Sequence, residues 1–150
     1  MIIFILNNVQ KYIFLNLNVL RKCIFADCFN FENRTMTIEE IINLVQGEIL
    51  CGDERVKEEV ACVFASDLMS DVLTLKDNDG LMLLTGLCNL QSIRTCEMSD
   101  INYILIVRGK EVTDDMLELA EDNDMVIIRT KYSMFKTSGI LYAAGLPPVY

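Results

Sequence analysis

Apolar and polar residues alternate in two different ways along residues 37–150. Short, continuous apolar runs are typical of buried strands, whereas apolar residues that recur every three or four positions indicate one face of a helix. The runs predict five strands, at 48–51, 60–65, 81–84, 103–107 and 125–128. The periodic segments predict five helices, at 38–45, 68–73, 90–98, 116–120 and from 134 to near 145.

N-capping residues stand before several of these helices. The clearest is the T-x-x-E capping box that Thr37 and Glu40 form at the first helix. The other predicted caps are Ser66 and Asp67, Asn89, and Thr113. Six methionines fall on apolar faces and are predicted to lie in the core: Met69, Met82, Met98, Met116, Met125 and Met134.

Nearly continuous apolar strands that alternate with helices indicate a parallel sheet covered on both faces. We therefore predict an α/β fold, a single three-layer domain with a mainly parallel sheet flanked by helices. The run at 60–65 is predicted to be a buried strand. For strand 48–51 an alternative stays open, an antiparallel hairpin with its neighbour.

Residues 1–36 differ from the rest because they are rich in Ile, Phe, Leu and Asn. No apolar run in them approaches the ~20 residues that span a bilayer, and they lack the basic start and cleavage site of a signal peptide. A clean helix start follows Met36. We interpret 1–36 as an atypical N-terminal extension, with translation beginning at Met36, and 37–150 as the domain; a peripheral amphipathic anchor and an extra packing helix are the alternatives.

The chain is acidic, with 13 Lys and Arg against 22 Asp and Glu and a net charge of −9. An acidic surface repels nucleic acid and anionic lipid, so we expect neither nucleic acid nor a membrane as a partner. Histidine is absent, which excludes Ser-His-Asp and Cys-His catalysis, and we predict no enzyme activity and no catalytic residue. The six cysteines include no C-x-x-C pair, so no metal site is predicted and a reducing cytoplasm is the expected location.

Polar and cationic residues follow directly on four of the predicted strands. In an open α/β sheet, ligands bind at the carboxyl ends of the strands, at the switch in strand order. Helix N-termini at this edge would favour an anion. The candidate ligand-binding residues here are Ser66, Asp67, Thr85, Gly86, Arg108, Gly109, Lys110, Thr130 and Lys131. Neither a P-loop nor a G-x-G-x-x-G motif is present, so no cofactor is predicted.

Each candidate also has a structural interpretation. Ser66, Asp67 and Thr85 are residue types common in caps and turns. Arg108 and Lys110 would then pair with acidic residues at 111, 114 and 115, in surface ion pairs that stabilise little.

Several strings together resemble the DRTGG-domain family over residues 38–146. They include ASDLMSDVL at 65–73, VRGK at 107–110, TKYSMF at 130–135 and GILYAAGL at 139–146. The letters D-R-T-G-G do not occur in sequence; Thr85-Gly86 and Arg94-Thr95 are the closest echoes. Arg94 and Thr95 therefore join the candidate ligand-binding residues, although a salt bridge from Arg94 to Glu97 or Asp100 is the structural alternative.

The resemblance implies a small α/β domain similar to the N-terminal domain of HPr kinase/phosphatase, regulatory, often dimer-forming, with catalytic machinery elsewhere. The leading hypothesis is a non-catalytic regulatory or ligand-binding domain that senses a small anionic metabolite and forms a homodimer. The alternative is a protein-interaction adaptor whose partner belongs to a hydrogenase or sensor-kinase system. An enzyme built on Cys88, Asp67 and Arg108 is the third hypothesis, and the sequence disfavours it.

Overall fold

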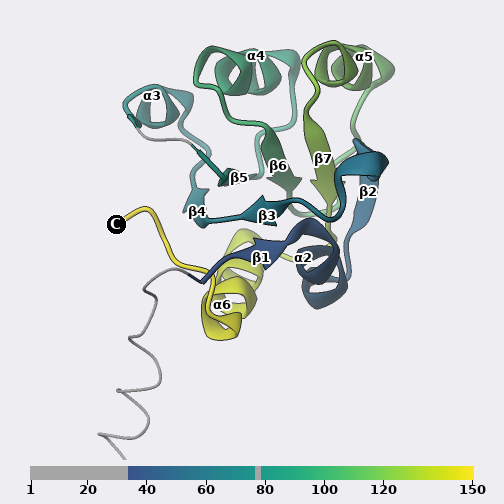
Figure 1. Ribbon diagram of the computed structural model, residues 1–150. Coiled ribbons are helices and arrows are strands. Elements are labelled where there is room, and N and C mark those ends of the chain that lie inside the picture. The colour runs from purple at the N-terminus through teal and green to yellow at the C-terminus, as the bar shows by residue number, and fades with distance from the viewer. Residues whose placement is uncertain (1–33, 77–78) are drawn as a thin grey trace, which may run out of the picture. The chain divides into compact units, whose positions relative to one another are not determined.

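The computed structural model describes residues 34–76 and 79–150, which belong to one compact unit of the chain. At its centre lies a five-stranded sheet in the order β2-β7-β6-β5-β4 (Figure 1). Its strands are β2 (Glu48–Cys51), β4 (Cys62–Ala65), β5 (Leu81–Thr85), β6 (Tyr103–Ile106) and β7 (Val126–Arg129). Strands β4 to β7 run parallel, and β2 pairs antiparallel with β7. The prediction of a mainly parallel sheet is confirmed.

Helices cover both faces of the sheet (Figure 1). One face carries α3 (Met69–Val72), α4 (Leu90–Met98) and α5 (Asp114–Asp122). The other carries α2 (Ile38–Val45), α6 (Met134–Ala144) and a two-stranded ribbon of β1 (Met36–Thr37) and β3 (Glu59–Val60). A 3-10 helix, η1 (Asp53–Arg55), follows β2.

Alternate residues of β5 supply the two cores, as expected for a strand buried on both faces. Met82 and Leu84 pack in the core that includes α2 and α6, whereas Leu81 and Leu83 pack in the core that includes α4 and α5. The predicted three-layer α/β fold is confirmed.

The strand order does not reverse within the parallel part of the described sheet, because β4, β5, β6 and β7 follow one another as neighbours. Successive right-handed crossovers in one direction place their helices on one face, and α3, α4 and α5 lie together accordingly (Figure 1). The expected switch in strand order is therefore wrong for these strands. The carboxyl ends of β4 to β7 still share one edge.

The run at 60–65 is not one buried strand. It divides at Ala61, with Val60 in β3 pairing to Met36 of β1, and the rest in β4. β4 lies at the edge of the sheet and is only partly buried. The C-terminal segment covers its outer side, since the Val63 N–H donates to the Pro147 carbonyl at 3.0 Å. The apolar run at 60–65 is continuous because two neighbouring strands, β3 in the ribbon and β4 at the sheet edge, each bury apolar residues.

The hairpin alternative for strand 48–51 is wrong, because β2 pairs with β7, which is far away in the chain. The helix predicted at 68–73 is shorter, Met69–Val72, and neither Ser66 nor Asp67 caps it; its N-cap is Leu68, without a side-chain hydrogen bond.

The capping boxes at Thr37 and Asn89 are present. Thr113 does precede α5, but its side chain makes no capping bond. The core assignment of Met98 is wrong, since this side chain at the end of α4 is 75% exposed.

Residues 1–33 of the predicted extension lie outside the described residues. Met36 is buried and pairs in β1, so it contributes to the fold. The interpretation of 1–36 as an extension stays a prediction. In the part of the chain that the structure describes, no helix has the length and apolarity needed to cross a membrane.

Candidate functional site

Four of the predicted strand-end residues meet at the carboxyl edge of the sheet, around the side chain of Asp67. Its Oδ1 atom accepts hydrogen bonds from the Thr85 hydroxyl at 3.1 Å and from the Gly86 N–H at 2.6 Å. Its Oδ2 atom accepts from Nη2 of Arg108 at 3.1 Å. We call the three donors, Thr85, Gly86 and Arg108, the strand-end cradle; Asp67 is the anion that they hold. The donors lie at the ends of β5 and β6, and Asp67 follows β4, the neighbour of β5.

The turn after β5 is shaped for this contact. The Leu87 N–H donates to the Thr85 hydroxyl at 3.1 Å, which leaves the hydroxyl proton for Asp67. A Cβ atom on Gly86 would lie 1.8 Å from Nη2 of Arg108. Only glycine therefore allows the guanidinium to rest against the backbone here.

The turn after β6 directs Arg108 toward this glycine. Arg108 and Gly109 have positive φ angles of 66° and 58°, which reverse the chain within two residues. The Arg108 N–H donates to the Tyr132 carbonyl at 2.8 Å and the Gly109 N–H to the Thr130 carbonyl at 2.9 Å. A left-handed backbone conformation costs a non-glycine residue such as Arg108 roughly 1–2 kcal/mol. These two hydrogen bonds hold the backbone in that conformation.

Asp67 and Arg108 remain accessible to solvent, with side chains 49% and 50% exposed. The expectation that Arg108 pairs with acidic residues at 111, 114 or 115 is wrong, because its ion pair is with Asp67. An exposed ion pair of this kind stabilises a fold by only about 0–1 kcal/mol. The Asp67 carboxylate and the Arg108 guanidinium can therefore separate and bind other partners at little cost in stability.

Half of the cations from residue 34 onward lie at or after the ends of β6 and β7, although the chain is acidic. Of the ten Lys and Arg residues from residue 34 onward, five are Arg108, Lys110, Arg129, Lys131 and Lys136. Arg129 pairs with Glu48 at 2.7 Å, and the Lys136 ammonium lies 3.2 Å from the ring centroid of Tyr132. Lys110 and Lys131 are exposed beside the turn at Gly109.

Two strand-end candidates bond within the fold. The Thr130 hydroxyl is buried, donates to the Val45 carbonyl at 2.7 Å and accepts from the Tyr132 N–H at 3.2 Å. The Ser66 hydroxyl accepts from the Leu68 N–H at 3.0 Å. Neither hydroxyl takes part in the hydrogen bonds of the cradle.

Arg94 and Thr95 lie within α4, away from the cradle hydrogen bonds. The Thr95 hydroxyl is buried and donates to the carbonyl of Gln91 in its own helix at 2.9 Å. Arg94 is exposed and forms no salt bridge to any residue in 34–76 or 79–150, so the expected pair with Glu97 or Asp100 is absent there.

Cys88 lies just beyond the cradle, before α4, and its thiol contacts the Glu111 carbonyl at 3.2 Å. Burial raises the pKa of the Cys88 thiol, although Lys110 and Arg129 oppose this effect. A raised pKa leaves little thiolate at neutral pH. The described part of the chain also holds no cluster of three or more cysteine or acidic side chains able to bind a metal ion.

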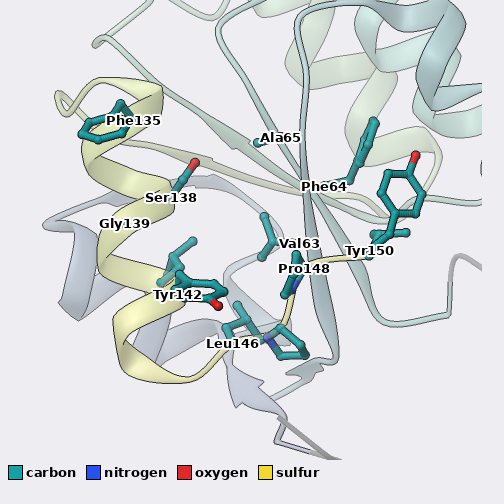
Figure 2. A pocket seen from close by; sticks show the side chains of 13 residues that line it. Val63, Phe64, Ala65, Phe135, Ser138, Gly139, Tyr142, Leu146, Pro148 and Tyr150 are labelled. Atoms are coloured by element: carbon teal, nitrogen blue, oxygen red, sulfur yellow. The ribbon is translucent and has the colours of Figure 1, made fainter. Parts of the chain in front are cut away.

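Sequence reasoning missed an apolar groove of about 420 Å³ between β4, α6 and the C-terminal segment. Figure 2 shows Tyr142, Leu146 and Pro148 around Val63, with Phe135 further along α6. Phe135 is 91% exposed. None of the side chains that line the groove is charged. The signal was present in α6, because its apolar residues surround the helix and one side cannot reach the core.

A model of the DRTGG domain matches residues 40–144. This chain belongs to the DRTGG domain family. No curated protein matches it.

The fold is shared with solved structures. One of them contains the CBS and DRTGG domains of the regulatory region of Clostridium perfringens pyrophosphatase, complexed with the activator diadenosine tetraphosphate. The TM-score is 0.55 at 17% identity, and the match covers 71% of this chain and 46% of that chain. This DRTGG domain therefore spans less than half of the length of that regulatory region.

The five letters that name the DRTGG domain do not follow one another in this chain. Of the two closest echoes of this motif, Thr85-Gly86 lies in the cradle, where both residues donate to Asp67. The other echo of the motif, Arg94-Thr95, lies in α4.

Proposed function

We propose that this DRTGG domain is a non-catalytic regulatory domain that binds a small anionic metabolite at the strand-end cradle. The convergence of Thr85, Gly86 and Arg108 on one carboxylate supports this proposal, because these donors are those that proteins use for oxyanions. The domain acts in the reducing cytoplasm, in keeping with the four described cysteines, which are all free thiols.

The relative supports a regulatory role and suggests ligands for a first screen. Its DRTGG domain lies in a regulatory region, and its activator, diadenosine tetraphosphate, carries a chain of phosphates. Phosphate groups suit a site of one guanidinium and one backbone N–H, with Lys110 and Lys131 exposed nearby. One phosphate group of such a compound is the group we place in the cradle.

A thermal-shift screen tests this proposal. Wild type, Arg108→Ala and Lys57→Ala are compared with acyl phosphates, sugar phosphates, nucleotides and diadenosine tetraphosphate. Lys57 is an exposed cation beside Glu58, whose carboxylate bonds Tyr103 at the opposite end of β6, so the control changes charge far from the cradle.

At about 100 times Kd a ligand adds roughly 2.7 kcal/mol of stability, a shift of roughly 10 °C in Tm for a domain of this size. We expect this shift in wild type and Lys57→Ala and its loss in Arg108→Ala. No shift with any compound in wild type, or an equal shift in Arg108→Ala, contradicts anion sensing at this site.

The groove supports the second part of the proposal, a homodimer in which a second copy docks along α6. In a chain with a net charge of −9, an uncharged face is where two copies can meet without bringing carboxylates together. Lys136 is the only charged residue of α6, and an exposed Phe135 offers an apolar anchor.

Light scattering on wild type, Phe135→Ser and Leu73→Ser tests the homodimer. Leu73 follows α3 on the other face of the sheet and is 51% exposed, so it is a matched apolar control. We expect dimers of wild type and Leu73→Ser and monomers of Phe135→Ser. A monomeric wild type would refute the dimer.

The groove also supports the alternative function, an adaptor for a hydrogenase or sensor-kinase system, because a large exposed apolar face often marks a protein interface. A monomeric wild type that retains a hydrogenase subunit or sensor kinase from native cells, when Phe135→Ser does not, would favour the adaptor over the homodimer.

A further inference from the structure

The strand-end cradle is already filled by an anion that belongs to the chain itself. One oxygen of Asp67 accepts two hydrogen bonds and the other accepts one, from a backbone N–H, a hydroxyl and a guanidinium. A phosphate or carboxylate group of a ligand would need the same three donors. Asp67 therefore occupies the position where such a ligand would bind.

The Asp67 carboxylate has no second structural task among the described contacts. The helix that follows it begins without its help, because Leu68 is the N-cap of α3 and the Ser66 hydroxyl accepts the Leu68 N–H. Every hydrogen bond that the structure gives the Asp67 side chain belongs to the cradle. The side chain can therefore leave without disturbing α3.

Asp67 is also placed to move. It lies between β4 and the four-residue helix α3, and its side chain is 49% exposed. The backbone before it is held, since the Ser66 N–H donates to the Leu84 carbonyl at 3.0 Å. Departure of the carboxylate thus requires movement only from residue 67 onward, in the β4–α3 loop.

We infer that Asp67 is a built-in competitor of the anionic ligand: the ligand's oxyanion replaces the Asp67 carboxylate in the cradle and thereby releases the β4–α3 loop. This inference rests on the proposed function of the cradle. The Gly86 N–H has a single proton, which it donates to Asp67 at 2.6 Å, so a ligand oxyanion can accept this bond only after the carboxylate has left. Binding is then coupled to the position of the loop, which supplies a conformational signal.

The competition lowers the apparent affinity by the fraction of molecules whose cradle is vacant. If Asp67 fills the cradle about nine-tenths of the time, its removal strengthens anion binding about tenfold. Titration calorimetry measures this with inorganic phosphate and, separately, acetate as probes. The two probes distinguish a preference for a phosphoryl group from one for a carboxylate.

Four proteins are compared: wild type, Asp67→Ala, Asp67→Asn and Asp71→Ala. Asp71→Ala makes the same change in net charge from an exposed position on α3, so it corrects for general electrostatics. Asp67→Asn removes the charge but keeps an acceptor for Gly86, and it stays informative if Asp67→Ala does not fold. We expect binding about tenfold tighter in Asp67→Ala, a smaller gain in Asp67→Asn, and a Kd like that of wild type in Asp71→Ala.

Hydrogen exchange supplies the second readout. We expect phosphate to speed exchange in the β4–α3 loop of wild type, and the loop of Asp67→Ala to exchange fast with or without phosphate. Equal gains in Asp67→Ala and Asp71→Ala, or weaker binding in Asp67→Ala, overturn the inference while leaving anion sensing intact. If none of the four proteins binds phosphate or acetate, the inference is overturned as well. Phosphate binding in the expected order of affinities, with no metabolite of the thermal-shift screen bound by wild type, supports the competition by Asp67 and refutes metabolite sensing instead.

Discussion

Replacing Gly86 by alanine tests whether the Arg108 guanidinium lies against this backbone. The three heavy atoms nearest to an added Cβ are Nη2, Cζ and Nε of Arg108, at 1.8, 2.5 and 2.6 Å. All three belong to the end of a flexible, half-exposed side chain. We therefore expect the guanidinium to swing into solvent while the turn after β5 keeps its backbone.

The expected change in stability is small because two effects oppose each other. Alanine at a compatible position stabilises by about 0.4–1 kcal/mol, since it restricts the unfolded chain. Loss of the exposed pair between Arg108 and Asp67 costs about 0–1 kcal/mol. We expect the free energy of unfolding of Gly86→Ala to lie within about 1 kcal/mol of wild type.

A double-mutant cycle separates the two effects. In an Arg108→Ala background the clash is gone, so Gly86→Ala should stabilise by the full ~0.4–1 kcal/mol. The positive φ of residue 108 burdens Arg and Ala alike, because both carry a Cβ. Urea unfolding followed by circular dichroism measures all four proteins. The same effect of Gly86→Ala in both backgrounds would refute the contact, and a loss above about 2 kcal/mol in wild type would refute the swing of the guanidinium into solvent.

Three further predictions concern other parts of the fold. Thr130→Val should cost about 1–3 kcal/mol in urea unfolding, because the buried Val45 carbonyl loses its donor at 2.7 Å, and Thr130→Ser should recover most of this loss. Gly139→Ala should raise stability by about 0.5–1 kcal/mol, since nothing lies within 4 Å of the added Cβ on α6 and glycine is a poor helix former; a fall in Tm would contradict this. The Arg55 guanidinium lowers the pKa of Glu58 below its ordinary 4.5, so this carboxylate stabilises the fold above that pH and its contribution fades as the pH falls through the folded value. Urea midpoints at about pH 7 and about pH 3.5 should therefore differ less in Glu58→Gln than in wild type, and equal differences would exclude this contribution.

The sequence predicted the elements whose burial repeats regularly. The runs at 81–84, 103–107 and 125–128 are central strands buried on both faces, so local apolar sequence and tertiary environment agree. The prediction of one strand at 60–65 was wrong because two neighbouring environments both require apolar residues. These are the ribbon at Val60 and the sheet edge at Val63. The antiparallel partner of β2 could not be predicted, because that pairing spans most of the domain.

The sequence predicted that the candidate site lies at the carboxyl edge of the sheet, but it did not predict which side chains contact one another there. Strand ends place Thr85, Gly86 and Arg108 near one another in any sheet where β5 and β6 are neighbours. What the sequence could not supply is the direction of Asp67. A Ser-Asp pair before a helix is an ordinary capping signal, but in this structure a shorter helix begins without it and the carboxylate turns to the guanidinium.

The absence of a strand-order reversal among β4 to β7 explains why this edge holds a carboxylate so readily. At a switch point, neighbouring strands send their loops to opposite faces, and a crevice opens between them. Here the β4, β5 and β6 crossovers all turn to the same face, so their loops stay side by side. A short side chain such as Asp67 can then reach across from β4 to Gly86 and Arg108. The ion pair that results stays about half exposed to solvent, with Arg108 and Asp67 at 50% and 49%, and this exposure is what the proposed exchange of Asp67 for a ligand's anionic group requires.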